Sequence, residues 1–362
     1  MDFVLSEMID KVMTARASLR PLYIQGGGTK QFYGEPMPPL SNGARLDISP
    51  FSGVVNYQPS ELVVTARAGT PLAEVEALLR SNRQMLAFEP PRHGLASTIG
   101  GCVAAGLSGP RRMMAGALRD FVLGATLLDA SGTILRFGGE VMKNVAGYDI
   151  SRLLAGSMGI FGPLLEVSLK VAPIPLAEET RVLELNEAEA LAKLNAWRSL
   201  PLPISATAWQ REEGIGLLRV RLSGSKPALE SARRTVGGMP VEDAQAAAYW
   251  EGLRDQTHPF FQVRPLWRLA LPPTMPPLEL GDMLIEWNGG LRWLDGTGVE
   301  ADFVRKTASR HGGHATLYRY EGNPAVPVFH PVAAGVHAIT QRLKQELDPT
   351  GMFNPGRLFR EF

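Results

Sequence analysis

The segment Tyr23-Ile24-Gln25-Gly26-Gly27-Gly28-Thr29-Lys30 constrains the fold more than any other stretch of the chain. A short apolar run, typical of a strand, passes directly into three glycines followed by a hydroxyl and an amine. Glycines lack a Cβ atom and adopt positive φ readily, so their backbone N–H groups can approach an anion closely. The spacing matches neither the GxxxxGK[ST] loop of nucleoside triphosphatases nor the GxGxxG turn of Rossmann folds. A phosphate cradle and an ordinary glycine turn both stay open for this segment alone.

Composition and charge narrow the class of protein. The 362 residues are 45% hydrophobic and 20% charged, with a formal net charge of +1. This length and balance predict a compact protein of two domains, and the near-neutral charge argues against nucleic acid as a partner. The single cysteine, Cys102, excludes an internal disulfide and any multi-cysteine zinc or iron–sulfur site built by this chain alone. A reducing, cytoplasmic location fits this cysteine usage.

The hydropathy pattern predicts no membrane insertion. Residues 1–20 carry Asp2, Glu7 and Asp10 among apolar positions, so they lack the basic start and unbroken apolar core of a signal peptide. No apolar run reaches the length that spans a bilayer. We therefore expect any membrane attachment to be indirect, through a partner protein.

Further glycine-rich segments follow the first one. Residues 96–106 hold almost no side chain larger than Val or Ile, so a ligand could lie flat against their backbone, although tight helix packing explains the same composition. After a predicted strand pair within 119–137, KNVAGYD at 143–149 and GSMGIFG at 156–162 precede a strand at 164–172. Glycine-rich segments set among strands favour a long, extended ligand over a lone phosphate.

Taken in order, these motifs resemble a known family. GGGT, STIGG, RDFVLG with the turn DASG, KNVAGYD and GSMGIFGPLLEVSLKV are similar to the FAD-binding domain of the vanillyl-alcohol oxidase and p-cresol methylhydroxylase type. The tail LDPTGMFNPGR at 347–357 looks like that family's closing segment. The resemblance implies an α+β fold: a two-part FAD-binding domain over 1–175, an α+β cap over 176–345 and a C-terminal return to the FAD domain over 346–362.

The resemblance also implies which residues bind FAD. Backbone amides of the first two loops would bind the pyrophosphate, and the later loops would lie near the rest of the cofactor. The residues are Gln25, Gly26, Gly27, Gly28, Thr29, Ser97, Thr98, Gly100, Gly101, Gly147, Tyr148, Ile160 and Gly162. Lys30 and Lys143 are either charge partners of the pyrophosphate or solvated lysines. Relatives that tether the flavin use a histidine near the first loop, absent here, or a cysteine in the second region. We interpret Cys102 as a small buried hydrophobe and expect noncovalent FAD.

The second half offers few catalytic candidates. His311 and His314 are the only spot comparable to the metal-binding pair of hydroxy-acid-oxidising relatives, and they lack a third ligand, so we interpret them as part of a turn and expect no metal. Weak candidates for catalysis or for binding a substrate carboxylate are His93, Tyr148, Arg292 and Arg319, with Tyr318 beside the last of them. Surface charges and a solvated loop histidine are the competing interpretations.

Over nearly its full length, including GGHATL at 312–317 and FNPGRLF at 353–359, the chain is similar to the family of FAD-binding subunits of bacterial glycolate oxidase complexes. The resemblance implies two partners, a longer flavoprotein subunit and an iron–sulfur subunit. The complex would oxidise glycolate to glyoxylate and lie, through its partners, at the inner face of the plasma membrane. The alternatives are a self-sufficient FAD-dependent dehydrogenase of a small 2-hydroxy acid or alcohol, and a structural subunit without catalysis.

Overall fold

The first half of the chain builds its sheets around one apolar core. The computed structural model describes residues 3–37, 43–139 and 149–362. Strands β1 (Leu22–Gln25) and β2 (Ala44–Asp47) pair in parallel. An antiparallel sheet has the order β3 (Val54–Gln58), β4 (Val63–Arg67), β8 (Leu164–Lys170), β6 (Val122–Leu128) and β7 (Ile134–Gly138), and β5 (Gln84–Met85) pairs with β9 (Ala172–Pro173). Inner strand β6 is buried along most of its length, whereas edge strand β7 alternates between exposed and half-buried residues.

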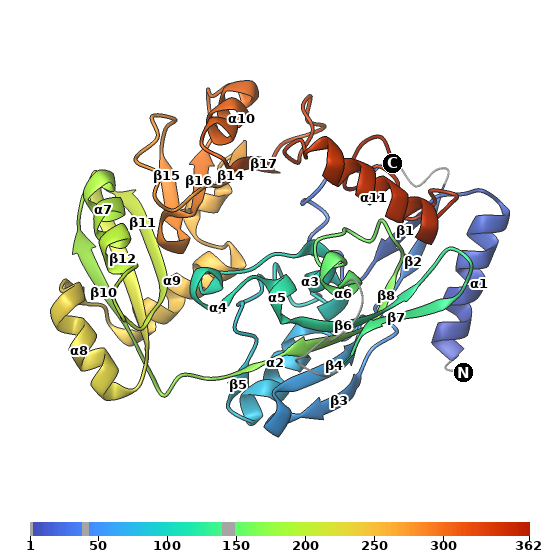
Figure 1. Ribbon diagram of the computed structural model, residues 1–362, viewed down its shortest axis with the longest axis horizontal. Coiled ribbons are helices and arrows are strands. Elements are labelled where there is room, and N and C mark those ends of the chain that lie inside the picture. The colour runs from blue at the N-terminus through green and yellow to red at the C-terminus, as the bar shows by residue number, and fades with distance from the viewer. Residues whose placement is uncertain (1–2, 38–42, 140–148) are drawn as a thin grey trace.

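Helices cover these sheets through faces that the sequence pattern sets (Figure 1). In α2 the buried Leu72, Val75 and Leu79 recur at helical spacing and join the core of the first sheets. The helices of this unit are α1 (Phe3–Ala17), α2 (Leu72–Ser81), α3 (Ile99–Ala105), α4 (Arg112–Ala115), α5 (Leu118–Phe121) and α6 (Ile150–Leu153), with a 3₁₀ turn at Pro59–Glu61. We call these sheets and helices the first unit.

The second half forms one large antiparallel sheet, which we call the cap. Its strand order is β13 (Met239–Pro240), β10 (Ala177–Glu184), β12 (Ile215–Gly224), β11 (Ile204–Glu212), β15 (Met283–Glu286), β16 (Leu291–Asp295), β14 (Leu266–Ala270) and β17 (His314–Arg319). Its helices are α7 (Glu187–Trp197), α8 (Lys226–Val236), α9 (Asp243–Asp255) and α10 (Ala301–Arg310), with 3₁₀ turns at Pro259–Gln262 and Trp287–Gly289.

Both faces of the cap sheet are covered. Helices α7, α8 and α10 bury Leu191, Leu229 and Val304 against one face. Helix α9 packs on the other face, where Trp250 joins a cluster that also contains Met158 of the first unit. The cap sheet therefore has helices on both faces. The reason is that neighbouring strand residues are apolar on both sides, so each face needs a cover.

The final helix returns to the first unit. Helix α11 (Ala334–Leu347) buries Leu347 in the first core, with Leu343 packed against it. The last cap strand ends at Arg319, and the predicted domain bounds stay a prediction. Apolar spacing in α11 indicates a buried face, but it does not say which of the two cores receives that face. Beyond the helix, Leu22 of β1 donates its N–H to the carbonyl of Met352.

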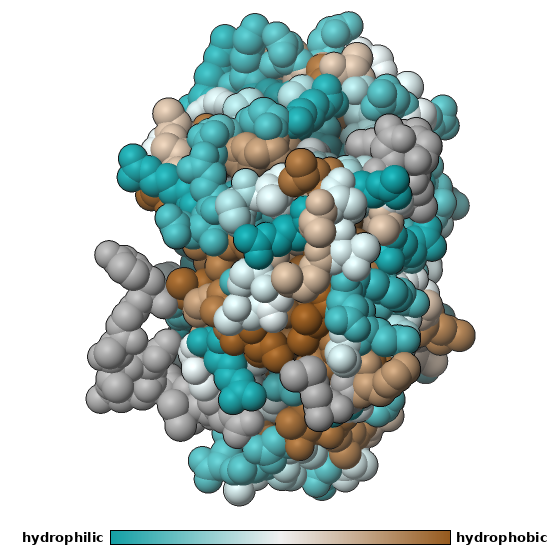
Figure 2. All heavy atoms as spheres, turned by 90° about the vertical axis from the view of Figure 1, so that its right-hand side faces the viewer, coloured by the Kyte–Doolittle hydropathy of each residue, from teal (hydrophilic) through white to brown (hydrophobic). Residues whose placement is uncertain are grey.

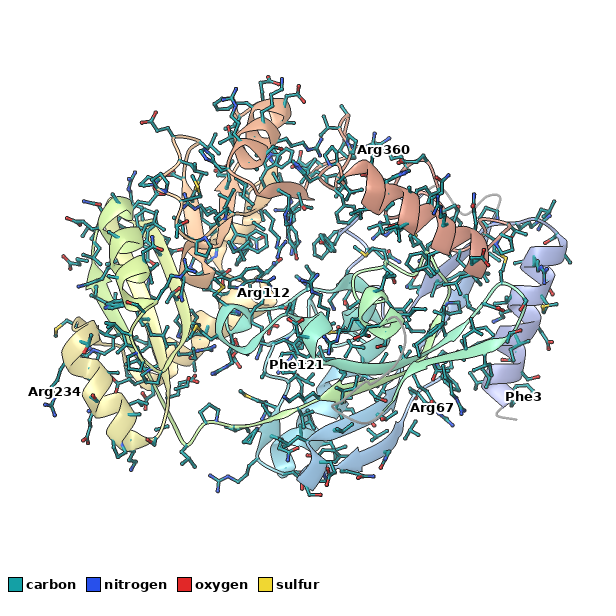
Figure 3. All side chains as sticks on the ribbon, viewed as in Figure 1. Phe3, Arg67, Arg112, Phe121, Arg234 and Arg360 are labelled. Carbon is teal, nitrogen blue, oxygen red and sulfur yellow. The ribbon has the colours of Figure 1, made fainter. Side chains whose placement is uncertain are left out.

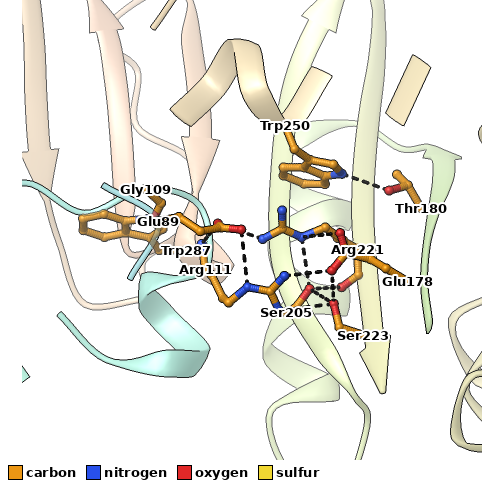
Figure 4. A network of polar contacts seen from close by, with 10 residues as sticks. All are labelled: Glu89, Gly109, Arg111, Glu178, Thr180, Ser205, Arg221, Ser223, Trp250 and Trp287. Atoms are coloured by element: carbon orange, nitrogen blue, oxygen red, sulfur yellow. Dashed lines mark hydrogen bonds and ion pairs between the residues drawn. The ribbon is translucent and has the colours of Figure 1, made fainter. Parts of the chain in front are cut away.

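A buried ionic network joins the two units (Figure 4). The guanidinium of Arg111 and that of Arg221 both contact the carboxylate of Glu89, and both also contact Glu178, at 2.7 and 3.8 Å. Burial opposes ionisation of Glu89, but the two arginines hold its pKa below its ordinary value. Because Glu89 and Arg111 belong to the first unit and the others to the cap, the network fixes how the units meet.

The side of the molecule that carries α1 and α11 is partly apolar. Figure 2 shows apolar side chains gathered toward the middle of this face, with polar ones around them. Phe3, Val336 and Ile339 are among the exposed apolar residues of these helices. No helix within the described ranges is long and apolar enough to cross a membrane.

Candidate functional site

The first glycine loop presents free backbone donors. It follows β1, whose last residue, Gln25, accepts a hydrogen bond from the N–H of Ile48. Within the described residues, no hydrogen bond uses the N–H groups from Gly26 to Thr29. Gly28 has a φ of 69°, which few residues other than glycine adopt. Successive free N–H groups of this kind form a concave donor surface suited to an anion.

Two adjoining hollows form a groove beside this loop. Both are lined by Ile24, Gly26, Thr98, Gly101, Ala104, Met158 and Asn354. The first extends along the loop to Lys30 and Arg357, and the second extends to Ile48, Gly159 and Gly162. The walls are mostly small side chains and backbone, so the groove suits an extended ligand that lies against the main chain.

Two glycines allow the first loop to pack on the second segment. A Cβ atom on Gly27 would lie 1.5 Å from the carbonyl oxygen of Ala96, and one on Gly26 would lie 2.4 Å from Oγ1 of Thr98. Both distances are far below van der Waals contact. Gly27 is thus required by the contact between the loops, and not only by the approach of a ligand.

The second segment uses several of its amides within the protein. Gly100 donates its N–H to the carbonyl of Ala68 at 2.8 Å, and Gly101 donates to Oγ1 of Thr98 at 3.2 Å, which caps α3. A Cβ on Gly100 would lie 2.5 Å from that of Ala68. Gly100 therefore lets α3 pack closely against the sheet. The predicted cofactor contacts of Ser97, Thr98, Gly100 and Gly101 stay a prediction.

Lys30 is a half-buried cation between the two loops. Its Nζ donates to Oγ of Ser97 at 2.7 Å, and it lies 3.4 Å from the carbonyl oxygen of Arg92. Burial lowers the pKa of Lys30, while the charge of Asp255 raises it. The ammonium group thus lies between the two loops and beside the groove, and its role as a charge partner of the pyrophosphate stays a prediction. Lys143 lies outside the described residues.

The third glycine segment and the tail complete the groove. Asn354 accepts a hydrogen bond from the N–H of Ile24 and donates to the carbonyl of Met158, both at 2.7 Å. Gly159 and Gly162 line the groove, whereas the side chain of Ile160 is fully buried in the first core and does not line it. Gly147 and Tyr148 lie outside the described residues.

Asn354 and Arg357 are groove residues that motif reasoning did not single out. Arg357 donates to the carbonyls of Gln31 and Tyr33 and so fixes the chain after the first loop. The FNPGR motif was recognised only as a closing segment. The signal available in the sequence was the pair of polar residues in this motif: asparagine is among the non-glycine residues that adopt a positive φ most readily, and Asn354 does so here, at 41°.

Cys102 lies in α3 with its side chain in the first core, 1% exposed. Burial raises the pKa of its thiol to about 12. The thiol is therefore protonated at neutral pH and unsuited to nucleophilic attack.

The catalytic candidates divide into two groups. His93 and Arg319 come together around Phe32: the ring centroids of His93 and Phe32 are 5.0 Å apart, and the guanidinium of Arg319 lies 4.1 Å from the centre of the Phe32 ring. Burial and then the charges of Lys30 and Arg319 lower the pKa of His93 to about 3, so its ring is neutral. Nε2 of His93 and the hydroxyl of Tyr318 are buried without a hydrogen-bond partner in the described part of the chain.

Arg292 does not join this group. Its side chain is fully buried in the cap and donates to the carbonyls of Met275 and Pro276 at 2.6 and 2.7 Å. It is neither a surface charge nor a substrate ligand, because its donors are consumed by the backbone. Among the described residues, no cluster of three or more His, Cys, Asp and Glu side chains could hold a metal ion.

These observations fit a dinucleotide such as FAD. The free amides of the first loop suit a pyrophosphate, Lys30 supplies a nearby positive charge, and the small residues of the groove admit an extended molecule. A family model described as "FAD binding domain" matches residues 5–138.

Comparison with known proteins decides the family. Glycolate oxidase subunit GlcE of Escherichia coli (strain K12) is 44% identical over 356 residues, which cover 98% of this chain and 97% of that protein. The chain belongs to the GlcE family. Glycolate oxidase subunit GlcD of Bacillus subtilis (strain 168) is 29% identical over 52% of this chain and 40% of its own length. The predicted family is confirmed, and with it the class of FAD-dependent oxidoreductases.

The fold has a solved counterpart. A structure of alkyldihydroxyacetonephosphate synthase superimposes with a TM-score of 0.66 and covers 97% of this chain and 74% of that one, at 14% identity. At this identity the match supports the fold alone. The predicted α+β class, an FAD-binding unit with an α+β cap, is confirmed.

Proposed function

We propose that this chain is the FAD-bearing GlcE-type subunit of a multi-subunit glycolate oxidase. The observation that carries the proposal is the first glycine loop, with four free amides facing a groove that Lys30 borders. Gly26 to Thr29 would bind the pyrophosphate through N–H groups, and Lys30 would offset part of its charge. Gly159 and Gly162 would leave room for the rest of the cofactor. FAD, when bound, would supply reversible one- and two-electron chemistry.

Noncovalent attachment is part of this proposal. The thiol of Cys102 points into the core and is protonated, and the described part of the first loop contains no histidine. Denaturation should therefore release the flavin from the polypeptide into the supernatant. Flavin that stays with the precipitated protein would contradict this assignment.

The proposed partners are a longer flavoprotein subunit and an iron–sulfur subunit. Oxidation of glycolate to glyoxylate removes two electrons and two protons, and the complex would pass the electrons through this chain toward the iron–sulfur partner. The similarity to the GlcD subunit supports a pair of related flavoproteins in one complex. Membrane association, at the inner face of the plasma membrane, would come through these partners.

A second candidate function is favoured by the group around Phe32. The unpartnered Nε2 of neutral His93 could accept a hydrogen bond from a substrate hydroxyl, and Arg319 beside it could bind a carboxylate. This arrangement supports a self-sufficient FAD-dependent dehydrogenase of a small 2-hydroxy acid, with the substrate between the cap and the first unit.

An anaerobic absorbance spectrum separates the two candidates. The purified chain is measured before and after addition of glycolate or D-lactate, first alone and then with the partner subunits. A flavin band that stays unbleached alone and bleaches with partners supports the relay subunit. Bleaching of the isolated chain supports the dehydrogenase, and a chain purified without any flavin would refute both.

A further inference from the structure

Two arginines without a counter-ion meet where the first unit contacts the cap. Arg112 begins α4 and Arg268 lies in β14, and each is half-buried. Figure 3 shows Arg112 between the two units. Neither side chain makes an ion pair or a hydrogen bond with any described residue. The preceding residue, Arg111, differs, because Glu89 and Glu178 hold its guanidinium. Among the described residues, no acceptor thus takes the N–H donors of Arg112 and Arg268.

Both guanidinium groups rest on one indole ring. Their central carbons lie 4.3 Å (Arg112) and 5.2 Å (Arg268) from the centre of the Trp287 ring. Trp287 is buried, and its Nε1 donates to the carbonyl of Gly109 at 3.0 Å, which fixes the ring. Stacking on an aromatic face orients a guanidinium but leaves its N–H groups available at the edge. Trp287 therefore acts as a platform for two sets of free donors.

The turn that carries this platform has an unusual backbone. Trp287 and Asn288 have φ angles of 55° and 54°, a left-handed conformation that non-glycine residues rarely adopt. Asn288 is held by Thr207, whose Oγ1 accepts from the Asn288 N–H and donates to its Oδ1, both at 2.9 Å. Strained backbone that the surroundings enforce in this way is found most often at binding sites.

The acidic groups nearby form no ion pair with either arginine among the described residues, although the charge of Asp120 raises the pKa of Arg112. Burial raises the pKa of Glu286 to about 7, and its Oε1 already accepts from Nε1 of Trp293. Burial and then the charge of Arg268 lower the pKa of Arg112, so the two cations are close enough to repel each other. An anion placed between them would relieve this repulsion.

We propose that Arg112 and Arg268, held on Trp287, form a binding site for the carboxylate of a small organic acid. A guanidinium presents paired N–H groups that match the two oxygens of a carboxylate. The ligand must be small, because the two arginines lie half-buried between the two units. Trp287 belongs to the same apolar cluster as Ala105 and Met158, two residues that line the proposed cofactor groove.

The proposal rests on the proposed function in one respect: glycolate is the first acid to be tested because it is the proposed substrate of the complex. Titration calorimetry of the flavin-loaded full chain, in buffer without competing carboxylates, measures binding of glycolate and of oxalate. We expect saturable binding that weakens at least about tenfold in Arg112→Gln and in Arg268→Gln, the loss expected for a charge-assisted hydrogen bond. Arg112→Lys keeps the charge without the paired donors and should give an intermediate loss.

The matched control is Arg305→Gln. Arg305 also stacks on a cap tryptophan, 5.4 Å from the centre of the Trp267 ring, but its guanidinium donates to the carbonyl of Pro327 and is not free. Binding should be unchanged in this variant. Thermal unfolding of each variant shows whether that variant folds. If a glutamine variant does not fold, the conservative Arg112→Lys variant still tests the site.

The outcomes are distinct from those of the proposed function. Calorimetry measures acid binding independently of flavin reduction. If the chain carries FAD and relays electrons but binds neither acid, the carboxylate site is wrong and the proposed function stands. Equal affinity in the wild type and both glutamine variants also overturns the carboxylate site. If neither acid binds and Arg268→Gln instead weakens assembly with a partner subunit, the pair binds a protein carboxylate and the small-acid site is wrong. Acid binding by a chain without FAD would support the site and refute the proposed function.

Discussion

Replacement of Lys344 by methionine should destabilise the first unit strongly. The Nζ of Lys344 donates to Oδ2 of Asp348 at 2.7 Å and to the carbonyls of Ile160 and Phe353 at 2.6 and 2.8 Å. The two charged side chains are only 4% and 0% exposed. Burial lowers the pKa of Lys344, and the charge of Asp348 raises it. The pair connects α11, the third glycine segment and the tail.

The expected loss of unfolding free energy is about 3–5 kcal/mol, because the carboxylate of Asp348 would stay buried without its partner. The chain provides a matched control in Lys306→Met. Lys306 and Asp302 are also a lysine and an aspartate four residues apart, but they are 68% and 80% exposed, and their nitrogen and oxygen are 3.4 Å apart. An exposed pair of this kind contributes about 0.5 kcal/mol or less.

The assay can assign the loss to one unit. All six tryptophans, Trp197, Trp209, Trp250, Trp267, Trp287 and Trp293, lie in the cap, so tryptophan fluorescence follows the unfolding of the cap. Far-UV circular dichroism follows the whole chain. In Lys344→Met, the first unit should unfold at a lower urea concentration, which circular dichroism would show as an earlier transition. The urea midpoint of the fluorescence transition, which reports on the cap, should change little. A loss no larger than that of Lys306→Met would refute the reasoning.

Three further predictions follow from individual residues. Gly27→Ala should lower both the flavin content and the melting temperature, because the new Cβ would lie 1.5 Å from a carbonyl oxygen. The control is Gly335→Ala, which lies in open space on α11 and should be neutral or stabilising. Equal behaviour of the two variants would contradict the loop contact. Glu286 has a folded-state pKa of about 7, raised by burial, so the native state keeps a proton that the unfolded state loses from pH 4.5 upward. Stability should fall by up to about 3 kcal/mol between pH 4.5 and pH 7, and Glu286→Gln should remove that part of the pH dependence in urea titrations. Cys102, buried and protonated, should react with a thiol reagent only at the rate of unfolding, and rapid labelling of the native chain would show that it is accessible.

The sequence predicted the loops of the groove better than the contacts between distant segments. Gly26, Gly28 and Gly162, which the motifs predict as cofactor contacts, all line the groove, and their contact with FAD stays a prediction. Loops that lie against a ligand are rich in small residues over several neighbouring positions, so the sequence shows such loops clearly. Ile160 lies between such residues, yet its side chain points into the core. Position in a motif does not decide which way a side chain points when the backbone turns at each residue.

Arg292 and Asn354 show why the rest was not predictable. A lone arginine in a strand suggests an exposed or ligand-binding charge, and only the fold shows two carbonyls that consume its donors. Asn354 acts on β1 across 330 residues of sequence, and no local pattern encodes a contact of that kind. Likewise, the pairing of Trp287 with Arg112 depends on how the two units meet.

The late tail imposes an order on biosynthesis. Asn354 binds the N–H of Ile24, and the main chain at Met352 pairs with Leu22, so the strand before the first glycine loop gains these neighbours only after 330 further residues. At about 5–20 residues per second, the ribosome needs roughly 15 to 70 seconds for that distance. A nascent chain therefore emerges with β1 lacking these tail contacts while the whole cap is being made. Loading of a cofactor into this groove is, on this geometry, a step that follows translation.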